Sequence, residues 1–116
     1  MPAPQTLAEL EADVARDLVL TAHPSNPWLE PKTSGGAPVL DCLIIGAGQC
    51  GLAVAHALRR DRVDNILVLD RAAHGREGPW VTYARMHNLR SWKTQIGPDL
   101  RLPALCYQAW HEAQWG

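Results

Sequence analysis

The chain opens with hydrophobic residues at helical spacing. The apolar residues of this segment lie three or four positions apart: Leu7, Leu10, Val14 and Leu18. This spacing is typical of one face of an amphipathic helix. Thr6 and Glu9 stand at the start of the stripe in the arrangement of a capping box, in which each side chain satisfies a backbone N–H at the helix start. The pattern predicts a helix from about Leu7 to Thr21.

Prolines and glycines then interrupt every periodicity between His23 and Pro38. Such a segment is typical of a linker or of an extended stretch of chain that wraps around a folded body. Trp28 is the large apolar residue that we expect to hold this stretch against the protein surface. We therefore predict one region at 1–38, made of the helix and a proline-rich linker, and a second at 39–116.

The hydrophobic pattern changes at Val39. Residues 39–45 form a nearly continuous apolar run, as expected for a strand buried on both faces of a parallel sheet. The pattern of residues 49–60 is that of a helix, with two arginines in its last turn. Asn65–Asp70 is a second apolar run, and it ends in an acid. Strand, helix and strand in this order predict a βαβ unit, and thus an α/β protein of Rossmann-like fold. A further helix is predicted over 104–115.

Composition narrows the class of protein. The chain has 116 residues, of which 47% are hydrophobic, and a formal net charge of -1. These values exclude a polybasic nucleic-acid binder and a disordered chain, and no apolar run is long enough to cross a membrane. The three cysteines form no CxxC motif, and the first residues lack the features of a secretion signal. A cytoplasmic protein is the expectation.

A GxGxxG motif joins the first strand to the helix. Its residues are Gly46, Gly48 and Gly51, and Asp70 follows at about the 20-residue spacing of the dinucleotide-binding fingerprint. The first glycine permits a tight turn, the second lets backbone approach a diphosphate, and the third allows close packing of helix on strand. The diphosphate would rest on free N–H groups at the helix start, which includes Gln49 and Cys50. Asp70 would accept hydrogen bonds from ribose hydroxyls and disfavour a 2′-phosphate. The alternative is a tight turn without a ligand.

Other chemistry has little support in the sequence. The histidines offer no pair at metal-ligand spacing, so no metal site is expected, and a GxSxG nucleophile motif is missing. Cys50 stands at a helix start, where a thiol can become reactive, but packing within the turn is the simpler interpretation. The segment from Arg71 to Arg101 contains six basic residues and two acidic ones. These bases form either a solvated surface or contacts to phosphate or carboxylate groups.

The segment that follows Asp70 carries a family resemblance. Gly78-Pro79-Trp80, the residues on to Met86, Asn88-Leu89-Arg90-Ser91 and Gly97-Pro98-Asp99-Leu100 resemble FAD-dependent, NAD(P)H-using flavoprotein monooxygenases. This group holds the flavin-containing, Baeyer-Villiger and amine N-hydroxylating enzymes. The sequence departs from their pattern at Pro79, which interrupts a glycine doublet before the tryptophan, and at Trp92, where proline is expected.

The resemblance implies a cofactor and a reaction. The first GxGxxG would bind FAD, and NAD(P)H would reduce the flavin from a second dinucleotide-binding domain in the complete enzyme. The reduced flavin would then react with O₂ to oxygenate a small-molecule substrate. By the same resemblance, Arg71 and Trp80 are expected to contact the cofactor, although Trp80 could equally be a packing residue.

Two strands are too few for a complete doubly wound domain, which uses five or six. We therefore expect the N-terminal portion of a longer enzyme, inactive and marginally folded when isolated, that binds FAD weakly or not at all. A homo-oligomer or the missing C-terminal portion would complete the sheet. The alternatives are the start of an NAD-dependent dehydrogenase or FAD-disulfide reductase, or a noncatalytic fragment that pairs with a partner.

Overall fold

The structure is a computed structural model that describes residues 5–88, 90–99 and 101–116. Leu89 and Leu100, which belong to the segment that carries the family resemblance, lie outside the described residues, as do Met1–Pro4. The elements along the chain are α1 (Leu7–Thr21), β1 (Lys32–Ser34), β2 (Ala37–Val39), β3 (Cys42–Ile45), α2 (Gln49–Arg60), β4 (Ile66–Leu69), the 3-10 turn η1 (Pro103–Leu105) and α3 (Tyr107–Trp115). They fall into two compact units, one with α1, η1 and α3 and the other from Ala22 to His87.

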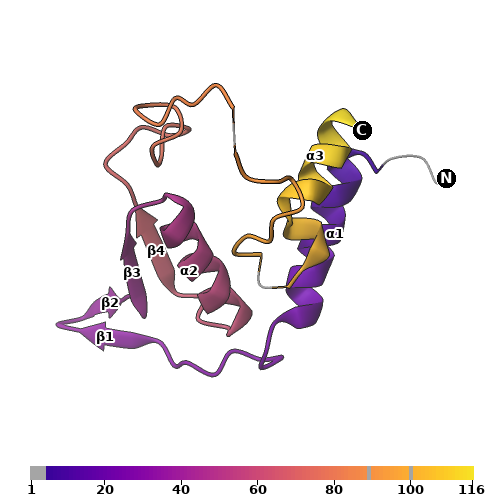
Figure 1. Ribbon diagram of the computed structural model, residues 1–116. Helices are drawn as coiled ribbons and strands as arrows, with labels where there is room; N and C mark the ends of the chain where they lie inside the picture. The colour runs from indigo at the N-terminus through magenta and orange to yellow at the C-terminus, as the bar shows by residue number, and fades with distance from the viewer. Residues whose placement is uncertain (1–4, 89, 100) are drawn as a thin grey trace. The chain divides into compact units, whose positions relative to one another are not determined.

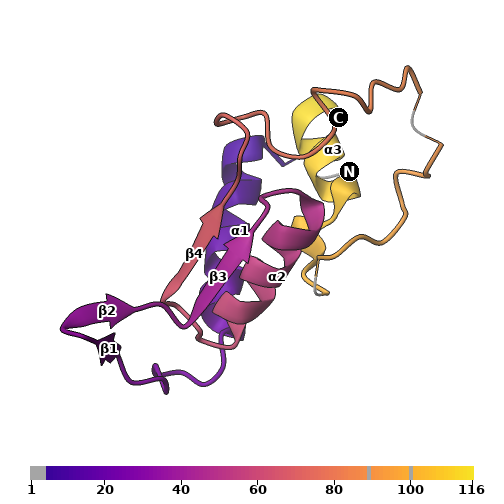
Figure 2. The same cartoon turned by 90° about the vertical axis from the view of Figure 1, so that its left-hand side faces the viewer.

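The first unit is a pair of helices joined to a short turn. Helix α1 begins with the predicted capping box, because the Thr6 N–H donates to Glu9 Oε2 over 2.8 Å and the Glu9 N–H donates to Thr6 Oγ1 over 3.3 Å. Helix α3 lies beside α1 in both views (Figures 1 and 2). Leu10 of α1 and Leu102 before η1 are the buried apolar residues of this unit, at 4% and 6% exposure. Leu7, Val14 and Leu18 of the stripe are half-buried, so this face of α1 lies against its neighbours.

The second unit is built on the predicted βαβ motif. Strands β3 and β4 pair in parallel, with Cys42 opposite Ile66 and Ile45 opposite Leu69, and α2 is the crossover between them (Figure 2). Ile44 is buried, at 9% exposure, whereas Ile45 next to it is 85% exposed. Alternate residues of a strand point to opposite faces, so one face of the two-stranded sheet packs under α2 and the other is open.

The proline-rich segment contains a hairpin that the sequence interpretation missed. Strands β1 and β2 pair antiparallel around Gly35 and Gly36, whose φ angles of 57° and 80° are those of a tight hairpin turn. The expected single strand over 39–45 is therefore wrong at its start. Val39 pairs with Lys32 in the hairpin, and β3 begins only at Cys42.

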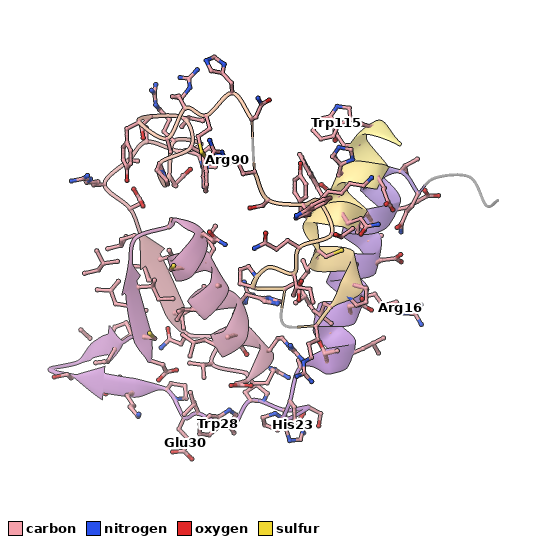
Figure 3. All side chains as sticks on the ribbon, in the orientation of Figure 1. Arg16, His23, Trp28, Glu30, Arg90 and Trp115 are labelled. Atoms are coloured by element: carbon pink, nitrogen blue, oxygen red, sulfur yellow. The ribbon has the colours of Figure 1, made fainter. Side chains whose placement is uncertain are left out.

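The stretch before β1 runs along the C-terminal end of α2, as expected for a wrapping segment. The His23 N–H donates to the Arg60 carbonyl over 2.8 Å, and the Trp28 indole N–H donates to the Asp61 carbonyl over 2.8 Å. Figure 3 labels His23 and Trp28 on this stretch. The prediction that Trp28 holds it against the protein is confirmed. Among the described residues, no helix has the length and apolar character needed to cross a membrane.

Candidate functional site

The turn between β3 and α2 ends in backbone N–H groups that have no hydrogen-bond acceptor among the described residues. The Gly46 N–H continues the sheet by donating to the Leu69 carbonyl over 2.7 Å, and Gly46 has a φ of 112° that favours glycine. Gly48 caps α2 without a side chain. From Gly48 to Gly51, the backbone N–H groups donate to no acceptor in the described part of the chain. This helix start therefore presents free donors and the positive end of the helix dipole.

Asp70 binds the same turn from the end of β4. One carboxylate oxygen, Oδ2, accepts a hydrogen bond of 2.8 Å from the Ala47 N–H. The other oxygen, Oδ1, accepts one of 2.7 Å from the Ala72 N–H. These bonds, first that of Ala47 and then that of Ala72, lower the pKa of Asp70 because they favour its ionised form. Each oxygen keeps a second lone pair with which it can accept a hydrogen bond from a hydroxyl group of a ligand.

The glycines of the motif serve different purposes. A Cβ on Gly51 would overlap the carbonyl group of Gly46, so glycine is needed there for α2 to pack against the end of β3. Gly48 differs, because its φ of -76° and ψ of -173° are open to any residue. A Cβ on Gly48 would meet a single neighbour, the Gly78 Cα at 3.7 Å, which is ordinary contact. The chain itself therefore accounts for glycine at 51 but not at 48.

The loop after β4 returns to the turn. Gly78 has a φ of 71°, and a Cβ on it would lie 3.6 Å from the Gly48 Cα and 3.8 Å from Trp80 Cδ1. Trp80 follows on the loop and is 53% exposed. Sequence reasoning treated Gly78 only as part of a family pattern. Its positive φ and its approach to Gly48 are the features that make it part of this site.

The remaining candidates, Gln49, Cys50 and Arg71, lie around the turn. Gln49 and Cys50 occupy the exposed first turn of α2, and Arg71 is exposed directly after Asp70. Cys50 is a free thiol. Sequence reasoning missed Ala47 and Ala72, which act through backbone N–H groups, and no signal in the residue types could have identified them.

This geometry suits the adenosine diphosphate half of a dinucleotide. Free N–H donors at the start of a 12-residue helix match the negative charge of a diphosphate. The ionised carboxylate of Asp70 matches ribose hydroxyls. The residues present therefore fit the group that the fingerprint predicts.

Comparisons with known proteins point to the same class of dinucleotide-binding fold. Residues 44–100 match the model of the family described as NAD(P)-binding Rossmann-like domain. The FAD-dependent urate hydroxylase of Xanthomonas campestris pv. campestris is 49% identical over 111 residues, which cover 96% of this chain and 24% of the hydroxylase. The chain thus spans about a quarter of the length of this curated relative. No solved structure matches the chain.

The predicted Rossmann-like α/β fold and the resemblance to flavoprotein monooxygenases are both confirmed. The family match covers β3 from Ile44, the glycine turn, α2, β4 and the loop that returns to Gly48. Residues 44–100 thus carry a Rossmann-like dinucleotide-binding segment, and the chain is similar to about a quarter of an FAD-dependent hydroxylase.

Proposed function

We propose that the turn from Gly46 to Gly51 binds the diphosphate of FAD, and that Asp70 holds the adenosine ribose. The observation that carries this proposal is the row of free N–H groups at the start of α2, beside the ionised carboxylate of Asp70. An anion can replace the missing acceptors of a helix start without any new side chain. Gln49 and Cys50 contribute backbone donors, and Arg71 and Trp80 lie on the loop that begins at the ribose site.

In the complete protein, FAD would supply the redox chemistry and NAD(P)H its electrons, while this segment binds and orients the cofactor. The substrate is then a small molecule. Because a urate hydroxylase is 49% identical to this chain, hydroxylation of urate is the first activity to test in a protein that contains it. The cytoplasm is the proposed location, since the three cysteines are free thiols and reduced thiols are typical of that compartment.

The experiment removes one backbone donor without removing the helix. Gln49 is the first residue of α2, where proline is tolerated because its N–H has no partner in the helix. Gly48 before it is extended, which suits a residue that precedes proline. Gln49→Pro therefore deletes a single N–H donor from the site. Gln49→Ala is the matched control, because it removes the side chain and keeps the donor.

Flavin fluorescence and calorimetry measure the binding of FAD and of ADP to the unaltered chain and to both variants. Of the two outcomes expected from the sequence, weak binding or none, the free donors of α2 favour weak, saturable binding of FAD that ADP displaces. Gln49→Ala should bind like the unaltered chain, and Gln49→Pro should bind roughly tenfold more weakly, the usual effect of losing one hydrogen bond to a charged group. Equal affinity of the two variants, or failure of ADP to displace FAD, would overturn the proposal.

A further inference from the structure

The loop between β4 and Trp80 is attached to the phosphate-binding turn at two places. At its start, the Asp70 carboxylate joins the Ala47 N–H of the turn to the Ala72 N–H of the loop. Near its end, Gly78 lies against Gly48. Residues 71–77 are thus held between two contacts to the same turn.

The contact between Gly48 and Gly78 is close because neither residue has a side chain. A methyl group on Gly48 would lie 3.7 Å from the Gly78 Cα, and one on Gly78 would lie 3.6 Å from the Gly48 Cα. Each methyl group alone would fit as an ordinary van der Waals contact. Two methyl groups would enter the same gap from opposite sides, and the loop would have to move away from the turn.

The contact places the Gly78 backbone against one side of the turn. The Gly78 backbone takes up the side toward which a Cβ of Gly48 would point. The N–H groups from Gly48 to Gly51, which have no acceptor among the described residues, remain open to an anion. A loop that keeps this position presents those donors in a fixed orientation.

We propose that Gly78 is a positioning residue for the phosphate-binding turn, and that its contact with Gly48 holds the turn in the conformation that accepts a diphosphate. The inference rests on the proposed function and extends it to the loop after Asp70. Gly78 acts through Gly48 and need not touch the cofactor itself.

The test is a double-mutant cycle of Gly48→Ala and Gly78→Ala on the full chain. Calorimetry measures the affinity of each variant for ADP and for adenosine, and urea unfolding measures its stability. Gly75→Ala replaces Gly78→Ala in the control cycle. Gly75 lies in the same loop with a φ of 78°, so alanine meets the same backbone strain there, but a Cβ on Gly75 has no neighbour within 4 Å.

We expect the double variant Gly48→Ala/Gly78→Ala to bind ADP more weakly than the product of the single effects, by roughly fivefold or more. Adenosine affinity should show no such coupling, since adenosine lacks the diphosphate that the turn binds. The control cycle with Gly75→Ala should be additive for ADP, for adenosine and for stability.

The outcomes separate this inference from the proposed function. If the unaltered chain binds no ADP, the proposed function fails and the inference fails with it. If the chain binds ADP and the Gly48/Gly78 cycle is additive, the inference alone is wrong. Equal coupling for ADP and adenosine, or coupling in stability without coupling in ADP affinity, would reduce Gly78 to a packing residue and also overturn the inference.

Discussion

The carboxylate of Asp70 accepts a hydrogen bond of 2.8 Å from the backbone N–H of Ala47. The acid at the end of β4 is thereby bonded to the turn at the end of β3, across two parallel strands. Asp70 would bind the ribose, and its hydrogen bond to Ala47 also holds the turn of the proposed diphosphate site. Its loss should therefore affect the folded turn as well as the ligand.

Asp70→Asn should weaken the binding of ADP by about tenfold, because a carboxamide offers one acceptor oxygen where the carboxylate offers two. The lowered pKa of Asp70 also predicts a pH effect. The ionised carboxylate stabilises the folded chain at neutral pH, and this stabilisation is lost as the pH falls through the folded pKa. Urea unfolding between pH 7 and pH 3 should show a flatter acid dependence in Asp70→Asn. Asp41→Asn is the control, and an equal flattening there would contradict this role of Asp70.

Gly51→Ala should destabilise the second unit by about 1–3 kcal/mol, the usual cost of overpacking, because the new methyl group would overlap the Gly46 carbonyl group. Urea unfolding of the full chain followed by circular dichroism measures this cost. Gly97→Ala serves as the comparison, since a Cβ on Gly97 meets no atom within 4 Å. If both variants unfold at the same urea concentration, α2 does not pack against β3 as closely as described.

Ile44 and Ile45 are neighbours in β3 with opposite surroundings. Ile44→Ala should cost about 2–4 kcal/mol of unfolding free energy, because it empties a buried position under α2. Ile45→Ala should cost about 0.5 kcal/mol or less, because that side chain is 85% exposed. Chemical unfolding of the two variants tests the difference. A large loss in Ile45→Ala would mean that the second face of the sheet is covered in solution.

His56 of α2 should make the protein less stable in mild acid. Burial, and then the charge of Arg60, lower the pKa of His56, and its Nε2 atom is buried with no hydrogen-bond partner. The unfolded chain therefore takes up a proton before the folded chain does. Stability is complete above the unfolded pKa of histidine and falls as the pH decreases toward the folded pKa.

The measurement is the unfolding free energy between pH 8 and pH 5. His56→Leu should lose less stability over this range than the unaltered chain. His87→Leu is the control, because the His87 side chain is exposed and its replacement should leave the pH dependence unchanged. The same slope in His56→Leu and in the unaltered chain would show that another group causes the acid sensitivity.

Much of the second unit could be predicted because its signals are local. The spacing of Gly46, Gly48 and Gly51 and the helical pattern after them identify the turn and α2, and both are confirmed. The short hairpin escaped prediction because Gly35-Gly36 was interpreted as an interruption rather than as a turn between two strands. The division of the chain between residues 38 and 39 stays a prediction.

The sequence by itself determined the elements whose cause lies within a few residues: the capping box of α1, the helix after the glycine turn, and an acid at the end of β4. Only the tertiary structure decided that Asp70 bonds to Ala47, that Gly78 meets Gly48, and that Ile44 is buried while Ile45 is open. The physical reason is that these relationships join backbone atoms or faces that are distant along the chain. Contacts between residues that are far apart along the chain cannot be derived from the local pattern of residue types.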